Sequence, residues 1–307
     1  MKYMNRSITV AVSFLALTFL LLSFSLSVNA QTLYSCESPS GGSNPFLHTI
    51  NPNTGAIIST TEITLDGETV RGCNGMAKHP QTDVCYMIVN VGKPRVPSQR
   101  RLATIDQNTG VATAIGNAEQ TFSTIAFTAD GTLYGVTGNG ASPPETLFTI
   151  DTNNGSTTQV MPLGNGNDGE TLAFNPVKSL LYHGSGNGIP YNDPSGQILE
   201  TINPLTLQIT PRTIQGNLDN FEEQSSMVYR SVNVFLTGTI DKYFFSITDS
   251  GFVTKLGEMD HVSKGLAFDC GGAAPVPTMS EWGLISTVIA LGLVSFFVLR
   301  RRSAFQK

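Results

Sequence analysis

Apolar and polar residues alternate in short stretches over most of the chain. The segments "RLATIDQNTGVATAIG" and "STIAFTADGTLYGV" alternate with a period of two on either side of turn sequences such as Asn-Thr-Gly and Asp-Gly. Alternation of this kind predicts β-strands, and the turn sequences predict hairpins between them. Between residues 31 and 274 no stretch of useful length has the period of an amphipathic helix. The pattern therefore predicts an all-β region.

This strand pattern repeats along the chain. "FLHTINPNTGAIIST", "TLFTIDTNNGSTTQV", "ILETINPLTLQITPR" and "YFFSITDSGFVTKLG" align with "RLATIDQNTGVATAIG" on one isoleucine. The aligned residues are 45 to 55 positions apart: Ile50, Ile105, Ile150, Ile202 and Ile247. Each unit divides into four short strands, which at this period is typical of a propeller blade. We expect a five-bladed β-propeller of four-stranded antiparallel blades; the alternative, a β-sandwich, does not account for five repeats.

The first strand of each unit has the pattern expected where blades converge on an axis. One position is always small: Gly75, Thr124, Thr171, Ser226 and Gly265. The next is large and apolar: Met76, Ile125, Leu172, Met227 and Leu266. The third is Ala77, Ala126, Ala173, Val228 and Ala267. Wedge-shaped packing near an axis requires such an alternation of sizes, so these strands are predicted to be innermost.

The two ends of the repeat region complement each other. The last unit stops after "KGLAFDC" without its second strand, and the exported chain opens with "TLYSC", which has the sequence of that strand. We expect residues 265–269 to pair with residues 33–37. The propeller, residues 31–271, would then be closed by a composite blade with no open sheet edge.

Four cysteines lie in the same region: Cys36, Cys73, Cys85 and Cys270. An even number in an exported segment favours two disulfides. In the repeat register, Cys36 and Cys73 fall near the start of the inner strands, and Cys85 and Cys270 fall near their end. We therefore expect pairs 36–73 and 85–270, although three connectivities are possible.

The N-terminus has the features of a secretory signal peptide. Lys2 and Arg6 precede an apolar run from Val10 to about Leu26, and a small-residue cleavage site ends at Ala30. We expect residues 1–30 to be removed; an uncleaved membrane anchor is the alternative.

A second apolar segment lies near the C-terminus. Residues 272–283 form a linker with a short motif, residues 284–299 are apolar enough to be a transmembrane helix, and residues 300–307 are basic. Arg300, Arg301 and Arg302 are expected to keep that end in the cytoplasm. A secreted domain held by its C-terminus is predicted.

The stretch "VPTMSEWGLI" closely resembles the IPTL-CTERM sorting signal. Val276 and Met279 are conservative replacements, and the matching positions are Pro277, Thr278, Ser280, Glu281, Trp282 and Gly283. The resemblance covers about thirty residues. It implies a Gram-negative bacterium in which a membrane-embedded exosortase-like transpeptidase recognises the tail at the inner membrane, removes it, and passes the protein to the cell surface or extracellular matrix. A permanent inner-membrane anchor is the alternative.

A candidate ligand site follows from the repeat register. At the start of the inner strands the equivalent positions are polar: Asn74, Ser123, Glu170, Ser225 and Lys264. Glu222 and Glu223 lie close by in the sequence. Polar groups that converge at a channel mouth are a candidate site. They are equally what lines a water-filled channel.

Metal and catalytic motifs are weak. The run "GNGNDGE" offers Ca²⁺ the oxygen ligands of Asn165, Asn167, Asp168 and Glu170, but it lacks the spacing of a dedicated loop, so a solvated turn is the competing interpretation. The four histidines have no metal-ligand spacing, and we interpret them as surface or loop residues: His48, His79, His183 and His261. No nucleophile elbow or phosphate loop is present.

Two functions remain open. The net charge of -5, with no basic cluster outside the termini, argues against nucleic acid as a partner. The repeats resemble bacterial propeller families of unknown activity, which implies no catalytic residues. We expect a non-enzymatic module that binds a glycan, a matrix polymer or a surface protein. The alternative is an exported hydrolase or lyase that uses Glu170 with Glu222 or Glu223 at the channel.

Overall fold

The structure is a computed structural model, and it describes residues 31–39, 44–92, 99–164, 170–187, 191–193 and 196–270. The predicted signal peptide, sorting motif, transmembrane helix and basic tail lie outside these residues. Within the described part, no helix has the length and apolar character needed to cross a membrane. The described strands belong to the unit of the chain that begins at Leu33.

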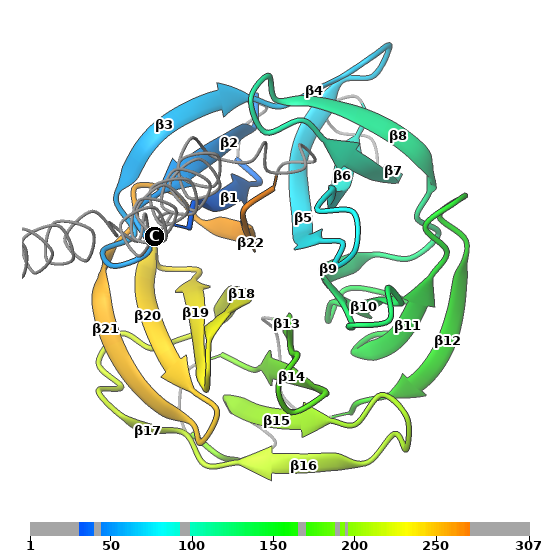
Figure 1. Ribbon diagram of the computed structural model, residues 1–307. Coiled ribbons are helices and arrows are strands. Elements are labelled where there is room, and N and C mark those ends of the chain that lie inside the picture. Colours follow the sequence, from blue (N-terminus) through cyan, green and yellow to red (C-terminus); the bar gives the residue numbers. More distant parts are fainter. Residues whose placement is uncertain are drawn as a thin grey trace, which may run out of the picture. The chain divides into compact units, whose positions relative to one another are not determined.

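Five antiparallel sheets surround a common axis, so the predicted five-bladed propeller is confirmed (Figure 1). Blade 1 consists of β22 (Ser263–Phe268), β1 (Leu33–Glu37), β2 (Phe46–Ile50) and β3 (Ile57–Glu62). Blade 2 consists of β5 (Val70–Lys78), β6 (Cys85–Val91), β7 (Gln99–Ile105) and β8 (Val111–Asn117). Blade 3 consists of β9 (Phe122–Phe127), β10 (Leu133–Thr137), β11 (Thr146–Ile150) and β12 (Thr157–Pro162).

The other two blades follow the same order. Blade 4 consists of β13 (Thr171–Asn175), β14 (Leu180–Ser185), β15 (Ile198–Ile202) and β16 (Ile209–Arg212). Blade 5 consists of β18 (Gln224–Ser231), β19 (Val234–Thr239), β20 (Tyr243–Thr248) and β21 (Phe252–Glu258). Two short strands that the sequence pattern did not predict, β4 (Thr64–Leu65) and β17 (Gln215–Gly216), pair in parallel with β8 and β21. Each connects one blade to the outer edge of the next.

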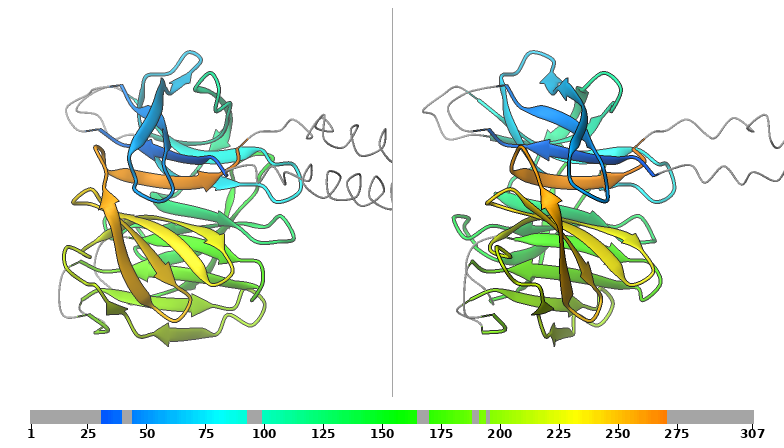
Figure 2. Two further views of the ribbon diagram at one scale, coloured as in Figure 1. Left: turned by 60° about the vertical axis from the view of Figure 1, so that its left-hand side comes forward. Right: turned by 90° about the vertical axis from the view of Figure 1, so that its left-hand side faces the viewer.

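The ring closes through the composite blade, as predicted. β1 pairs with β22 in an antiparallel register that places Leu33 opposite Phe268 and Tyr34 opposite Ala267. In the side views the dark blue strand β1 and the orange strand β22 run next to each other (Figure 2). The described residues at both ends of the propeller are therefore neighbours.

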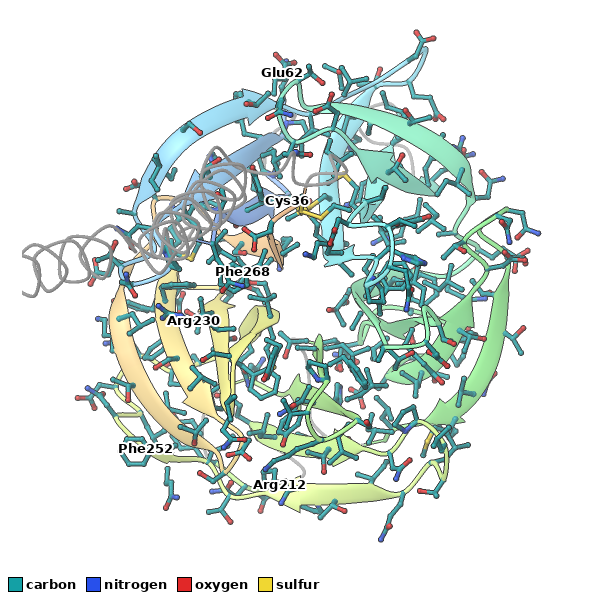
Figure 3. All side chains as sticks on the ribbon, in the orientation of Figure 1. Cys36, Glu62, Arg212, Arg230, Phe252 and Phe268 are labelled. Carbon is teal, nitrogen blue, oxygen red and sulfur yellow. A yellow bond between two sulfur atoms is a disulfide. The ribbon has the colours of Figure 1, made fainter. Side chains whose placement is uncertain are left out.

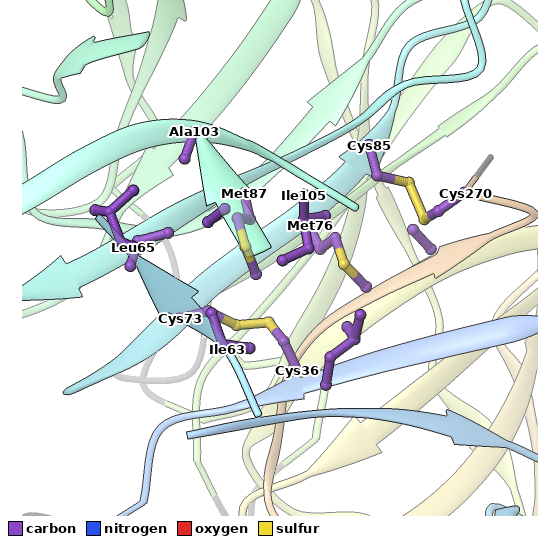
Figure 4. Close-up of a cluster of buried hydrophobic side chains, with 14 of the residues drawn as sticks. Cys36, Ile63, Leu65, Cys73, Met76, Cys85, Met87, Ala103, Ile105 and Cys270 are labelled. Carbon is purple, nitrogen blue, oxygen red and sulfur yellow. A yellow bond between two sulfur atoms is a disulfide. The ribbon is translucent and has the colours of Figure 1, made fainter. Parts of the chain in front are cut away.

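Two disulfides fasten this closure to blade 2, and both predicted pairs are confirmed. Cys36 of β1 bonds Cys73 of β5, with a Cα–Cα distance of 6.1 Å. Cys270, just beyond β22, bonds Cys85 of β6, with a Cα–Cα distance of 5.2 Å. Figure 4 shows them at opposite ends of one apolar cluster. Each terminal strand is thus covalently linked to the neighbouring blade.

The five inner strands pack by the predicted alternation of sizes. In every space between blades, a small residue of one inner strand lies in the same apolar cluster as a large residue of the next. The pairs are Ala77 with Ile125, Ala126 with Leu172, Ala173 with Met227, Val228 with Leu266, and Ala267 with Met76. Small groups let neighbouring inner strands approach closely enough to exclude water.

Gly75 and Gly265 show why the preceding position must be small. A Cβ atom on Gly75 would lie 2.7 Å from the backbone nitrogen of Ile125. A Cβ atom on Gly265 would lie 2.7 Å from the backbone nitrogen of Met76. Gly75 also has a φ of 75°, which favours glycine. Two backbones meet at each position, so a side chain there would force the blades apart.

The propeller has two unlike faces. Inner strands begin at what we call the loop face, which carries the long connection 138–145 and the described parts of the connection after β14, residues 186–187, 191–193 and 196–197. They end at what we call the turn face, which carries the tight turns 51–56, 106–110, 151–156 and 203–208. β1 begins beside the end of β22, so Leu33 and Cys270 both lie at the turn face. The chain therefore enters and leaves the propeller on the side opposite the long loops.

Candidate functional site

The predicted polar ring lies where the inner strands begin, on the loop face. Register shifts interrupt β9 next to Ser123, β18 at Ser225 and β22 at Lys264. In β5 one of two shifts falls between Asn74 and Met76, so Gly75 is the extra residue there and Asn74 pairs with Ile88. A bulge turns a side chain out of the regular alternation, so Ser123, Ser225 and Lys264 are re-aimed in the same region of three strands.

The side chains of this ring have different partners. The Asn74 Oδ1 atom accepts a hydrogen bond of 2.6 Å from the Asn90 amide, and the Ser225 hydroxyl donates one of 3.2 Å to the Gly238 carbonyl. Lys264 is half-buried, and its burial lowers the pKa of its ammonium group against the opposing effect of Glu223. The ring is thus partly occupied by contacts within the protein.

Glu170 is the most deeply buried residue of the ring, with an exposed fraction of 2 %. Its Oε2 atom lies 2.6 Å from His183 Nε2, and its Oε1 atom accepts a hydrogen bond of 2.9 Å from the Ser185 hydroxyl. Both carboxylate oxygens are therefore engaged. The other three residues of the possible Ca²⁺ run lie outside the described residues, namely Asn165, Asn167 and Asp168.

His183, a buried residue of β14 in blade 4, lies between two carboxylates. Its Nδ1 atom lies 3.0 Å from Glu200 Oε1, opposite Glu170 at Nε2. Burial alone would lower the pKa of this imidazole, but the two glutamates outweigh it and raise the pKa to about 10. His183 is an imidazolium at neutral pH, and both ring nitrogens donate. Hydrogen bonds to both nitrogens leave no lone pair for a metal.

Two further histidines lie next to each other between blades 1 and 5. The rings of His48 and His261 are 4.1 Å apart between centroids, and His261 Nε2 lies 2.7 Å from the Ser35 hydroxyl. Ser35 donates to Ser263 at 2.8 Å, as does Ser226. Burial, the neighbouring His48 and Lys242 lower the pKa of His261 to about 3. Burial also lowers the pKa of His48, so both rings are neutral at pH 7.

The interpretation of the histidines as surface or loop residues was therefore wrong for two of them, because His48 and His183 are buried within strands β2 and β14. His79 and His261 do lie in connections between strands, although His261 is buried there. The alignment of the repeats could have revealed the burial of two histidines, because His48 in "FLHTI" and His183 in "LLYHG" lie within predicted strands. Their partners Glu37, Glu170 and Glu200 come from other strands, which no spacing along one strand reveals. Among the described residues no group of histidine, cysteine, aspartate and glutamate could hold a metal.

A polar recess of about 250 Å³ opens on the loop face, at the outer strands of blade 2 and the connection to blade 3. It is lined by Gln99, Arg100, Arg101, Asn117, Ala118, Glu119, Gln120 and Thr121. The Arg101 guanidinium is fixed by Glu68, with Nε 2.7 Å from Oε1 and NH2 3.1 Å from Oε2. Burial lowers the pKa of Arg100. The recess offers planar amide and guanidinium donors held by the sheet; it was not predicted from the sequence.

No protein-family model and no curated protein matches the chain. Among solved structures, a chain in the nidogen/laminin complex has a TM-score of 0.46 and 10% identity, covering 78% of this chain and 98% of that one. An auxiliary nutrient binding protein from Bacteroides thetaiotaomicron has a TM-score of 0.44 and 12% identity, covering 76% of this chain and 63% of that one. A gluconolactonase from Xanthomonas campestris has a TM-score of 0.41 and 12% identity, over 77% of this chain and 79% of that one. These similarities concern the fold alone.

Proposed function

We propose that this protein is an exported, non-enzymatic β-propeller that binds a glycan, a matrix polymer or a surface protein through its loop face. The polar recess around Gln99, Arg101 and Gln120 is the observation that carries the proposal. Amides and guanidinium groups of fixed geometry suit hydroxyl and carboxylate groups of a polymer. The exit of the chain at the turn face leaves the recess accessible on a tethered molecule.

Delivery belongs to the same proposal. The tail that resembles the IPTL-CTERM signal, from Pro277 to the arginines at 300–302, supports recognition by an exosortase-like enzyme at the inner membrane. The mature protein then resides at the cell surface or in the extracellular matrix of a Gram-negative bacterium. The two disulfides agree with an oxidising compartment.

The delivery step is tested by changing the tail. Replacing Arg300, Arg301 and Arg302 with glutamine, or deleting from Pro275 onward, should change both the cell fraction that contains the protein and the mass of its mature form. A control that replaces Lys307 with glutamine keeps the arginine cluster and should behave as the unaltered protein. Identical fractionation and identical mass in all forms would refute sorting by this tail.

The binding step is tested on purified protein against an array of glycans and matrix polymers, with and without Ca²⁺. Replacing Gln99 and Gln120 together with alanine removes two hydrogen-bonding side chains and should weaken binding about tenfold. Replacing Asn108 and Asn153 with alanine on the turn face is the matched control and should leave affinity unchanged. Equal loss in both variants would place the binding surface elsewhere.

The hydrolase or lyase alternative requires free acids that meet at the channel. Glu170 is committed to His183 and Ser185, and its exposed fraction is 2 %. A catalytic carboxylate must reach a proton on the substrate, which this arrangement does not favour. Release of reducing sugar from a bound polymer would support the hydrolase alternative, and release of an unsaturated product would support the lyase alternative.

A further inference from the structure

The part of the central channel nearest the turn face contains a cavity. It is lined neither by the polar ring nor by the residues of the recess. Its volume is about 160 Å³. Three consecutive residues from each of the five inner strands line it, in three tiers, so the lining comes from every blade. The channel side of these strands lies at the centre of Figure 3, where Phe268 is labelled, whereas Glu62, Arg212 and Phe252 lie at the outer rim.

The tiers differ in size and character. Nearest the loop face is the layer of large apolar residues: Met76, Ile125, Leu172, Met227 and Leu266. The middle tier is small: Ala77, Ala126, Ala173, Val228 and Ala267. The tier at the turn face is mainly aromatic: Lys78, Phe127, Phe174, Tyr229 and Phe268.

Among the described residues that line the cavity, the one cationic side chain is that of Lys78, and its ammonium group lies 2.9 Å from Asp83 Oδ1. These described residues therefore contribute no net charge to the cavity. Polar groups come instead from the backbone, because each inner strand is an edge strand whose free side faces the axis. One of these groups, the amide of Leu172, donates to Thr124 Oγ1 at 3.1 Å. The cavity thus has apolar walls with hydrogen-bonding groups along the strand edges.

Two members of the aromatic tier pack against other aromatic rings. Phe127 contacts Tyr86 edge-on with 5.1 Å between centroids, and Tyr229 contacts Phe235 edge-on at 5.5 Å. Rings packed in this way present faces and edges to a guest ring at little cost in conformational entropy. An enclosed apolar cavity of about 150 Å³ is known to hold one benzene molecule, and this cavity has a comparable volume but is open to solvent.

We propose that this cavity binds a small neutral molecule with one six-membered ring and a hydrogen-bonding group on its edge, of which phenol is the simplest example. The volume admits a single ring, the aromatic and apolar tiers contact its faces, and the strand edges receive its polar group. The absence of net charge in the lining disfavours anions such as benzoate. This site is separate from the recess on the loop face.

The methionines allow a direct test on the full-length protein. With ¹³C-labelled methionine methyl groups, titration with phenol should shift the Met76 and Met227 signals saturably, because both line the cavity and an aromatic guest adds a ring current. Met87, Met161 and Met259 lie outside the cavity and serve as internal controls. Equal shifts at all five methionines, or none at Met76 and Met227, would overturn the proposal.

A matched pair of variants locates the guest. Val228→Phe fills the middle tier and should abolish the phenol-dependent shifts, whereas Val232→Phe changes an exposed turn residue and should preserve them. Poor dispersion of the methyl signals would show that Val228→Phe is misfolded. In that case the titration of the unaltered protein remains the test of the proposal. Shifts that persist in a folded Val228→Phe protein would contradict binding in this cavity.

Three further compounds test the class of ligand. Benzene lacks the polar edge and should require a concentration about three- to tenfold higher than phenol for half-saturation. Benzoate should produce no saturable shift at Met76 and Met227. Methyl glucoside should bind more weakly than phenol, and tighter binding of the sugar would replace the proposed ligand class with a carbohydrate ring.

Discussion

The charged centre of blade 4 is His183, enclosed by Glu170 and Glu200. All three side chains are almost fully buried, and the positive imidazolium separates two negative carboxylates. Burying charge in this way stabilises the fold only while every partner is present. Removing the central ring takes away the positive charge that lies between two buried carboxylates.

Replacement of His183 with leucine should destabilise the propeller by about 3 to 5 kcal/mol, because two buried carboxylates lose the cation that lies between them. Replacement of His79 with leucine, in a turn, is the matched control and should cost less than about 1 kcal/mol. The free energy of unfolding, measured in urea at pH 7, distinguishes the two. Similar values for both variants would show that the buried cluster contributes little.

The same histidine sets a pH dependence on the alkaline side. Its pKa is raised to about 10 in the folded protein from an unfolded value near 6.5, so the folded state binds the extra proton between these values. Its contribution to stability is complete below about pH 6.5 and is lost as the pH rises through about 10. The unaltered protein should therefore lose more stability than the His183→Leu variant between pH 7 and 10.

His261 acts in the opposite direction on the acid side. Its pKa is lowered to about 3, so the unfolded chain binds a proton that the folded protein excludes. This contribution is complete above about pH 6.5 and is lost as the pH falls. Glu37, Asp260 and Lys242 are the charged groups that act on the His48–His261 pair. His261→Phe keeps the ring contact and should reduce the loss of melting temperature between pH 6.5 and 4; an unchanged loss would contradict this assignment.

At the scale of elements, the Asn-Thr-Gly turns explain the most regular part of the repeat. Asn51 and Asp106 each accept a hydrogen bond of 2.8 Å from the backbone amide two residues later. Gly55 and Gly110 end these turns with φ values of 78° and 72°. The fourth unit has Leu207 at this position with a φ of 59°, a left-handed conformation that disfavours a side chain.

Leu207→Gly should therefore stabilise the protein by about 0.5 to 1 kcal/mol, since relief of the left-handed strain exceeds the entropy lost by glycine. Gly155 has the equivalent conformation, with a φ of 78°, and Gly155→Leu should destabilise. Differential scanning calorimetry of both variants measures the effect. A lower melting temperature for Leu207→Gly would indicate that the packing of the leucine side chain outweighs its strain.

Much of the architecture could be predicted from the sequence, because the patterns that determine it occur in every repeat. Period-two alternation, the turn residues and the size pattern at Gly75, Met76 and Ala77 recur in each unit, so five weak signals add up. The pairing of Cys36 with Cys73 followed from the same register. The two-residue strands β4 and β17 carry no pattern of their own, because they are formed by contact with another blade.

The candidate sites were less predictable, because their contacts form between different strands. Glu170 was correctly placed at the start of an inner strand, yet its engagement by His183 depends on the register between β13 and β14, in which Leu172 lies opposite His183. The recess at Gln99 and Gln120 combines residues from β7 and from the connection after β8. The contacts at these candidate sites join different strands, and the periodicity of a single strand contains no information about them.

At the scale of the whole molecule, closure depends on two terminal strands and two disulfides. The bond between Cys85 and Cys270 closes a sequence separation of 185 residues, and that between Cys36 and Cys73 closes 37. Cross-links of this kind restrict the unfolded chain, and the longer loop restricts it more.

Replacing Cys85 and Cys270 with serine should lower the free energy of unfolding by about 2 to 5 kcal/mol, and replacing Cys36 and Cys73 should lower it somewhat less. Guanidinium unfolding of both double variants under non-reducing conditions gives the comparison. With dithiothreitol, the unaltered protein should approach a variant that lacks all four cysteines. A smaller loss for the 85–270 variant would show that strain or residual structure outweighs loop length.

The position of Cys270 has a mechanical consequence. β22 is held to β1 by hydrogen bonds, and Cys270 follows it directly on the side where the chain leaves. A pull on the chain beyond Cys270 therefore passes through a covalent bond into Cys85, at the start of β6, before it loads the seam between β22 and β1. A propeller attached through the chain after Cys270 could therefore withstand a pulling force there without the separation of β22 from β1.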